Sequence, residues 1–302
     1  RDQLILGKTI GGLISLLVPL VVPFLIGIIM LVIYPDLSFT LEDWIRIGLI
    51  FVMFLLYLSV FFTLGLLISS LTSRSSSSLF ILLFIWVTFI FIIPKAAVIV
   101  AGQINPIPSA HEVTAQKDAF LQGISGSTQK EVQEWMKENP RDETPEWQEN
   151  FRSYIEDVQQ NATAQIDKKN AELESEYQSK RNKQQMLALY LSRISPASAL
   201  TFGAMSIGKT GIQEHGRFLN SIKIYKPVFT KWANTKMMRN INFSEPANQP
   251  KPDISDMPRH EFKEASLRNS FALAIPDFTV MILMIIVFFA AAFVSFLRYD
   301  VR

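Results

Sequence analysis

One short stretch of the sequence has residue types and spacing that could bind a nucleotide. Residues 203–210 read GAMSIGKT, which matches the pattern G-x-x-x-x-G-K-[ST] of a phosphate-binding P-loop. Such a loop binds phosphate only where it joins a buried strand to the N-terminus of a helix. The preceding MLALYLSRISPASALTF instead shows a helical leucine pattern followed by Ser-Pro. We interpret the match as fortuitous and expect turns or helix ends there, at Gly203, Gly208, Lys209 and Thr210.

The sequence contains no other familiar constellation for catalysis or metal binding. Cysteine is absent, which excludes disulfides and thiolate metal sites. The three histidines, His111, His215 and His260, lack the spacing of a helical zinc site, and neither G-x-S-x-G nor H-E-x-x-H occurs. We therefore expect no metal site, no cofactor and no catalytic residue in this chain.

The composition indicates a membrane protein. Of the 302 residues, 49% are hydrophobic and 23 are Phe, which is too apolar for a soluble chain of this length. The formal charge of +2 and the lack of basic runs interleaved with aromatic residues argue against nucleic-acid binding.

Four nearly charge-free stretches are long enough to cross a bilayer as helices, which takes roughly 20 residues each. The sequence therefore predicts an all-α membrane protein. The Thr40–Asp43 stretch TLED has the form of a capping box before the second stretch. The predicted transmembrane helices are residues 9–34, 47–71, 79–101 and 275–297.

The positive charges near the ends of these stretches predict the orientation. The positive-inside rule favours an arrangement with both visible ends in the cytoplasm, because five basic residues then lie inside and two outside. The inside set is Arg1, Lys8, Arg74, Arg298 and Arg302, and the outside set is Arg46 and Lys95. Residues 1–8, 72–78 and 298–302 would then be cytoplasmic, and residues 35–46 and 102–270 extracytoplasmic.

Two charged residues are expected near the outer membrane interface. Lys95 and Asp277 both lie at the margins of predicted membrane helices. They could form an ion pair with each other, or each could be an independent interfacial anchor.

The region 102–270 is predicted to be a helical extracytoplasmic domain. It has 22 Lys or Arg and 21 Asp or Glu residues, so it is solvated and nearly neutral. The stretch SAHE at 109–112 has capping-box form, and Thr144-Pro145-Glu146 is typical of a helix start. From there to about Ile194 no Pro or Gly interrupts the chain, which predicts one long helix.

An apolar stripe runs along this long helix at spacings close to 3.6 residues. It suggests an antiparallel hairpin with residues 112–139, and the same stripe could alternatively bind an external partner. The stripe consists of Phe151, Ile155, Val158, Ile166, Leu173 and Tyr177.

Residues that favour turns and helix ends predict the remaining external segments. Ser195-Pro196 begins a new element, and residues 240–258 form a loop rich in Pro, Asn and Asp. We expect residues 258–270 to return to the membrane as a short polar helix.

Several stretches resemble one family of membrane proteins. RDQLILGKTIGGLISLLVPL, LGLLISSLTSRSSSSLFILLFIWV and the closing FLRYDVR resemble the cytoplasmic entry, turn and tail of ABC-2 type transporter permeases. SPASALTFGAMSIGKTGIQEHGRF is similar to the external insertion of their multicopper-enzyme-maturation or gliding-type subgroup, with Lys209-Thr210-Gly211 in place of a Gly-Thr-Gly-like turn. Such permeases have six membrane helices, so the resemblance implies that two N-terminal ones are missing here.

The resemblance implies partners rather than catalysis. ATP and Mg are expected on a separate cytoplasmic ABC ATPase chain, with a second permease copy or paralogue beside this one in the lipid of a bacterial inner membrane. The contact with the ATPase is expected near the start of the chain, where the charged residues could alternatively be membrane anchors. The expected coupling residues are Arg1, Asp2, Gln3 and Lys8.

Two functions follow from the resemblance and the external domain. The chain could be an export or extrusion permease, or a mechanotransmitting scaffold whose external helices engage a periplasmic or surface protein without moving cargo. The spans contain few polar residues, and these more often form helix–helix hydrogen bonds than line a path. The main ones are Ser15, Ser59, Thr63 and Thr88.

Overall fold

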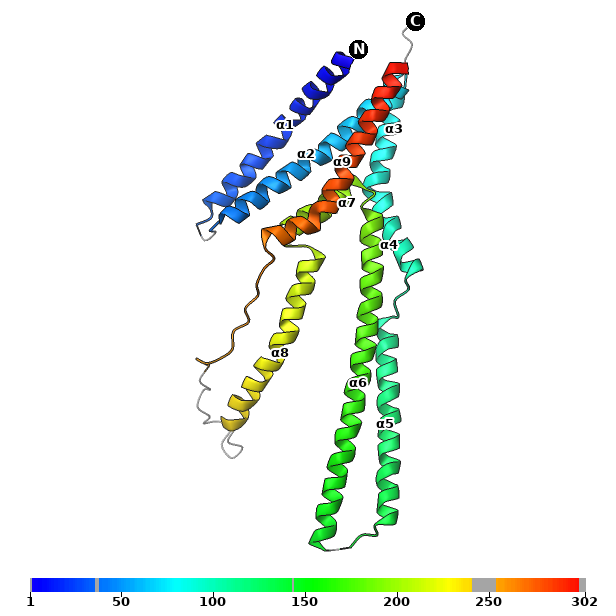
Figure 1. Ribbon diagram of the computed structural model, residues 1–302, viewed down its shortest axis with the longest axis vertical. Coiled ribbons are helices and arrows are strands. Elements are labelled where there is room, and N and C mark those ends of the chain that lie inside the picture. The colour runs from blue at the N-terminus through cyan, green and yellow to red at the C-terminus, as the bar shows by residue number, and fades with distance from the viewer. Residues whose placement is uncertain (1, 36–37, 143, 241–253, 299–302) are drawn as a thin grey trace. The chain divides into compact units, whose positions relative to one another are not determined.

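The computed structural model describes residues 2–35, 38–142, 144–240 and 254–298, and these residues form helices and connecting segments without strands (Figure 1). The predicted all-α fold is confirmed. Four helical stretches are long and apolar enough to span a membrane: Gly11–Ile33, Leu41–Leu71, Ser75–Ile104 and Leu267–Leu297. Each overlaps one of the four predicted transmembrane helices.

The chain divides into two compact units. Unit 1 comprises Arg1–Pro94 and Arg193–Arg302, and unit 2 comprises Lys95–Ser192. The region expected to be one external domain is thus shared between them, because residues from Arg193 onward belong with the membrane helices.

Unit 1 has three helices at its centre. These are α2 (Leu41–Leu71), α7 (Pro196–Ile207) and α9 (Leu267–Arg298), and each packs against the other two. Helix α1 (Asp2–Ile33) packs on α2, where the rings of Phe24 and Phe51 lie 4.5 Å apart. Helix α8 (Ile212–Asn240) follows α7. The buried apolar core of this unit is Met53, Val60, Ala199, Ile207, Ala274 and Met281.

The ends of several helices follow from local sequence. Thr40 caps α2 through the predicted capping box with Asp43, since each side chain bonds the other residue's backbone. The charge-free stretch predicted that this membrane helix starts at residue 47, but the capped helix begins at Leu41. Ser195 caps α7, with Pro196 at the first helical position as the Ser-Pro pair predicted.

The third span changes its helical register. It consists of α3 (Ser75–Val87), a π-helical turn η1 (Thr88–Ile92) and α4 (Ile93–Ile104). Pro94 is the second residue of α4, directly after this turn, and has no N–H to donate to an earlier carbonyl. A π-turn next to Pro is one way for a helix to continue past the missing hydrogen bond.

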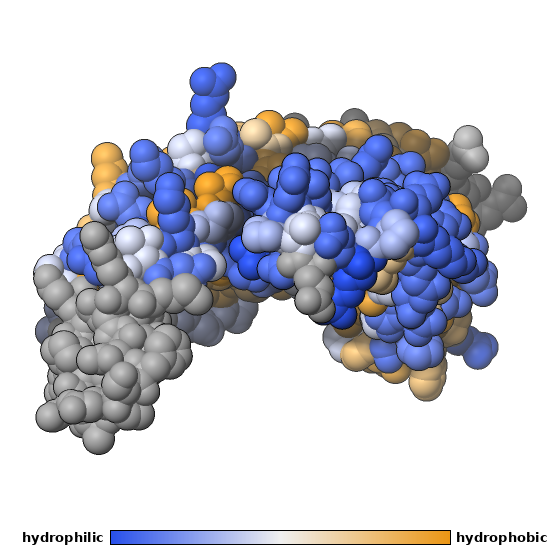
Figure 2. Space-filling model, turned by 90° about the horizontal axis from the view of Figure 1, so that it is seen from below, coloured by the Kyte–Doolittle hydropathy of each residue, from blue (hydrophilic) through white to orange (hydrophobic). Residues whose placement is uncertain are grey.

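Unit 2 contains the predicted hairpin of two long helices. Helix α5 (Ala110–Glu138) begins at the SAHE capping box, and α6 (Pro145–Ser192) runs for 48 residues without interruption. Their far ends join through four aromatic rings, in which Trp135 stacks on Tyr154 at 5.0 Å and Trp147 on Phe151 at 5.1 Å. The face of the molecule shown in Figure 2 is mostly hydrophilic, as expected for solvated helices.

One predicted element is absent from the structure. Residues 258–266 were expected to be helical, but the chain is extended there and α9 begins only at Leu267. The predicted loop at 240–258 falls largely on residues 241–253, outside the described residues.

The close packing around Gly203 generates a stability prediction. A Cβ atom at Gly203 would lie 2.1 Å from Met53 Cε and 3.2 Å from Asp277 Cβ. Because Met53 and Asp277 are fully buried, Gly203→Ala is expected to destabilise the protein by about 1–3 kcal/mol. Thermal unfolding of the detergent-solubilised protein, followed by circular dichroism, measures this.

Gly216→Ala is the matched control for this substitution. Gly216 lies in α8 with no atom within 4 Å of the added methyl group, so alanine should be neutral or slightly stabilising there. Equal melting temperatures for the two variants would contradict the packing described around Gly203.

Candidate functional site: buried polar contacts around helix α7

A buried ion pair lies just before α7. Arg193 donates from Nε to Oδ1 of Asp277 at 2.7 Å and from Nη2 to Oδ2 at 3.4 Å. Asp277, on α9, is fully buried, and the Arg193 side chain is 12% exposed. This two-point contact fixes the start of α7 against a membrane-spanning helix.

The capping residue of α7 also bonds to the third span. The Ser195 hydroxyl donates to the Phe89 carbonyl in the π-turn and accepts from the Ser198 N–H. In π-helical register the Phe89 carbonyl would receive the N–H of residue 94, which is proline. Ser195 thus supplies the donor that Pro94 lacks, and it joins α7 to η1.

The other end of α7 is held by Arg46, which lies one turn into α2. Its Nη1 donates to the Ile207 carbonyl at 2.7 Å, and its Nη2 donates to the Ala265 carbonyl at 2.9 Å. Ile207 is the last residue of α7, where the helix dipole is negative and favours a cation. The side chain of Arg46 is buried, so a single guanidinium connects the starts of two spans with the end of α7.

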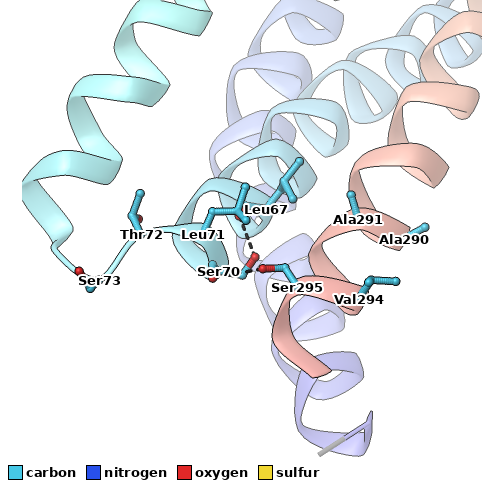
Figure 3. Close-up of a pocket in the computed structure, with 9 residues that line it drawn as sticks. All are labelled: Leu67, Ser70, Leu71, Thr72, Ser73, Ala290, Ala291, Val294 and Ser295. Atoms are coloured by element: carbon cyan, nitrogen blue, oxygen red, sulfur yellow. Dashed lines mark hydrogen bonds between the residues drawn. The ribbon is translucent and has the colours of Figure 1, made fainter. Parts of the chain in front are cut away.

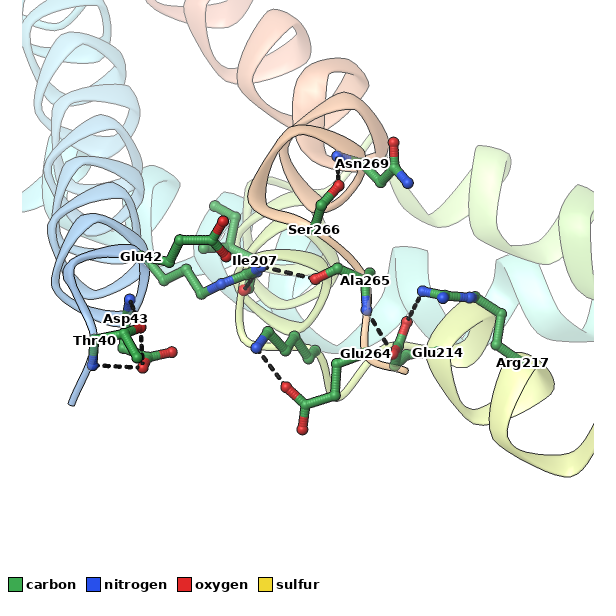
Figure 4. Close-up of polar contacts among 12 residues, drawn as sticks. Thr40, Glu42, Asp43, Ile207, Glu214, Arg217, Glu264, Ala265, Ser266 and Asn269 are labelled. Carbon is green, nitrogen blue, oxygen red and sulfur yellow. Dashed lines mark hydrogen bonds and ion pairs between the residues drawn. The ribbon is translucent and has the colours of Figure 1, made fainter. Parts of the chain in front are cut away.

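The extended segment before α9, residues 258–266, is bound along its length by side chains of α2 and α8 (Figure 4). Glu214 accepts the Ala265 N–H at 3.0 Å, and Arg217 donates to the Lys263 carbonyl at 2.9 Å. Further along, the Tyr225 hydroxyl donates to the Pro258 carbonyl. We call residues 258–266 the strap. Its backbone groups bond side chains in place of a helical ladder, which explains why the expected helix is missing.

The GAMSIGKT stretch is the second half of α7 and its C-terminal cap. Gly208 ends the helix, Lys209 has a left-handed φ of 58°, and the Thr210 N–H donates to the Met205 carbonyl at 2.9 Å. These are features of a Schellman cap, with no strand before it. Lys209 Nζ pairs with Glu264 of the strap.

A recess lies at the opposite end of the α2–α9 pair (Figure 3). It has a volume of about 880 Å³, and the Ser295 hydroxyl donates across it to the Ser70 carbonyl at 3.3 Å. No side chain that lines it is titratable, so it offers hydroxyl and backbone groups but no acid, base or metal ligand. The lining residues are Leu67, Ser70, Leu71, Thr72, Ser73, Ala290, Ala291, Val294 and Ser295.

Comparison with known proteins identifies the class of this molecule. The family model described as "ABC-2 family transporter protein" matches residues 1–301. The chain belongs to the ABC-2 transporter family. Proteins of this family are membrane permease components of ABC systems and are not themselves catalytic. Searches of curated proteins and of solved structures found no match.

Three of the four expected coupling residues of this ABC-2 permease belong to the first turns of α1. The helix includes Asp2, Gln3 and Lys8, whose side chains are outside the described part of the structure, and Arg1 is itself outside the described residues. Their role therefore stays a prediction.

The structure gives Asp277 a partner that the sequence did not suggest. The sequence left open an ion pair of Lys95 with Asp277 or two independent anchors, but Arg193 binds both carboxylate oxygens of Asp277. Lys95 belongs to unit 2, whereas Asp277 belongs to unit 1. Nothing in sequence spacing links Arg193 to a residue 84 positions later.

The apolar stripe of α6 contributes to the hairpin seam. Val158 is buried, and Phe151 lies 5.5 Å from the Trp135 ring of α5. The other stripe residues are half-buried. The stripe therefore packs at least in part within the hairpin, and its proposed role in binding a partner stays a prediction.

The residues that hold α7 were largely missed by sequence reasoning. Arg46 entered only as a flanking charge, although a lone arginine six residues into a capped membrane helix is a usable signal. Arg193, Glu214 and Glu264 carried no signal, because their partners are distant residues or backbone groups.

The buried ion pair generates a second prediction. Asp277→Ala would leave the Arg193 guanidinium buried without its counter-charge, so we expect a loss of about 3–5 kcal/mol in unfolding free energy. The double variant Arg193→Met with Asp277→Leu should lose less than Asp277→Ala, because it leaves no unpaired charge. Unfolding in detergent followed by intrinsic fluorescence measures both.

The exposed pair of Lys180 with Glu176 is the control. Its side chains are 46% and 62% exposed, so Glu176→Ala should cost below about 1 kcal/mol. If Asp277→Ala cost no more than Glu176→Ala, the buried pair would not hold α7 in place.

Proposed function

We propose that this chain is the transmembrane subunit of an ABC-2 export or extrusion system, driven by a separate ATPase chain that carries ATP and Mg. The observation that carries the proposal is the fixation of α7 by three buried contacts to three different spans. Arg193 binds Asp277 of α9, Ser195 binds the π-turn, and Arg46 of α2 binds the end of α7. Helices joined in this way move together as a rigid body.

The energy of ATP hydrolysis would enter at the cytoplasmic end of the membrane helices, away from α7. Residues 1–8, with Arg1, Asp2, Gln3 and Lys8, are the proposed contact with the ATPase. Movement of α1 would pass to α2 through their packing, where Phe24 contacts Phe51, and from α2 through Arg46 to α7 and the strap.

A second candidate function is supported by the polar groups of the spans. The hydroxyls of Ser15, Ser59, Thr63 and Thr88 each donate to a carbonyl of their own helix. Their protons are therefore used within their own helices, which leaves only their oxygen lone pairs to face a polar path. This favours a scaffold that transmits movement to a periplasmic or surface protein, or a path formed between two permease chains.

The proposed topology places both visible ends in the cytoplasm of a bacterial inner membrane and residues 102–270 outside. These 302 residues contain no cysteine, so a single serine-to-cysteine variant introduces one labelling site among them. Ser179→Cys in α6 should react with a membrane-impermeant maleimide on intact cells, whereas Ser76→Cys in α3 should react only after permeabilisation. Both serines are exposed. The opposite labelling pattern would overturn the topology.

Partnership with an ATPase is tested by purification of the intact complex. We expect an ATPase with Walker motifs to co-purify with the tagged chain. Charge reversal of both Arg1→Glu and Lys8→Glu should reduce the ATPase recovered by roughly tenfold, because attractive contacts become repulsive. Lys180→Glu, in the exposed middle of α6, is the control and should leave recovery unchanged.

Two results would count against the proposal. Recovery of the permease without any ATPase would defeat the proposed function as a whole. Unchanged recovery and ATP turnover in the charge-reversed variant would defeat the coupling role of residues 1–8 and leave Arg1 and Lys8 as membrane anchors.

A further inference from the structure

The far end of the hairpin is strongly acidic. Residues 131–157, here called the acidic end, contain nine Asp or Glu residues and three Lys or Arg residues, a formal charge of −6. All the described carboxylates in this range are exposed, and none forms an ion pair within the part of the chain that the structure describes. They are Glu131, Glu134, Glu138, Asp142, Glu146, Glu149, Glu156 and Asp157.

Aromatic contacts join the two helices at the acidic end. The stacked rings of Trp135 with Tyr154 and of Trp147 with Phe151 hold α5 and α6 together there. Desolvation, and then the charges of neighbouring glutamates, raise the pKa of Tyr154 above its ordinary value. A cluster of negatively charged side chains of this kind attracts a basic surface.

Helix α8 provides such a surface. The strap covers one side of it through contacts to Phe218 and Tyr225, and Asp256, just before the strap, accepts a hydrogen bond from Trp232 on α8. On the sides that the strap leaves uncovered, Lys223, Lys226 and Lys231 are exposed and form no ion pair among the described residues. Over Ile212–Asn240 the helix has six Lys or Arg residues and one Glu, a formal charge of +5.

Exposed apolar side chains accompany the charges on both surfaces. Leu219 and Ile222 of α8 are 40% and 37% exposed. A groove of about 490 Å³ continues from the acidic end along the hairpin and is lined in part by Val132, Met136 and Ile166. Charge complementarity with a small apolar centre is the usual composition of a protein interface.

We propose that the acidic end of one copy of this chain docks on the lysine face of α8 of a second copy. A two-fold axis would form this contact twice, because each copy supplies one hairpin and one α8. The contact lies outside the membrane spans and does not depend on coupling to an ATPase, so it goes beyond the proposed function.

Site-directed cross-linking between two differently tagged copies tests the proposal. One copy carries Ser153→Cys in the acidic end, and the other carries Thr230→Cys beside the α8 lysines; both positions are exposed and uncharged. In membranes holding both full-length copies, a bismaleimide should give a product with both tags. Replacing Ser153→Cys by Ser179→Cys, which lies outside the acidic end, should give at least about fivefold less.

Charge exchange separates docking from simple proximity. Lys223→Glu, Lys226→Glu and Lys231→Glu together should lower the mixed product roughly tenfold, and Glu138→Lys, Glu146→Lys and Glu149→Lys in the other copy should restore it. Three results would overturn the proposal. They are absence of the mixed product, a product formed only within a single copy that carries both cysteines, and a mixed product whose yield does not change on charge reversal. Since no ATPase is needed, loss of this contact and loss of ATPase binding are separate results.

Discussion

A charged side chain inside an apolar helix bundle needs its counter-charge within reach, and Asp277 meets that condition through Arg193. The pair sets the position of α7, because Arg193 precedes the first residue of α7 by only three positions. Close approach of the helices is then possible because the facing residues are small. Gly203 of α7 lies close to Met53 of α2 and Asp277 of α9. Ala199 of α7 and Ala274 of α9 are fully buried in the same core.

The other contacts of α7 depend on this placement. Once the start of the helix is fixed, its end reaches Arg46, and the cap that follows brings Lys209 to the strap. The first and third spans differ from this centre, since their most apolar stretches have no buried residues. Side chains such as Ile14, Val18 and Phe84 are therefore left for lipid or for another chain. Helices α2, α7 and α9 are thus fixed to one another, whereas the first and third spans expose apolar side chains.

Local signals made much of this fold predictable. Hydropathy located the spans, and the boxes at Thr40 and Ser109 located helix starts, because each depends on residues within four positions. The contacts of α7 could not be predicted in the same way. Arg46 binds carbonyl groups, which every residue possesses, and Asp277 finds its partner 84 positions away. The strap was expected to form part of a short polar helix, but side chains of α2 and α8 form hydrogen bonds with its backbone groups.

The cap at the end of α7 explains why a nucleotide-binding pattern can arise without a nucleotide. A chain that reverses direction beside a packed helix needs glycine for the same reason as a chain that wraps a phosphate, namely close backbone approach. Here Gly208 closes the helix and Lys209 adopts the left-handed conformation, so the lysine is directed by backbone geometry to Glu264. A phosphate group would have to compete with that carboxylate. Pattern searches of membrane proteins will meet this coincidence wherever a Gly-Lys-Thr turn separates two helices.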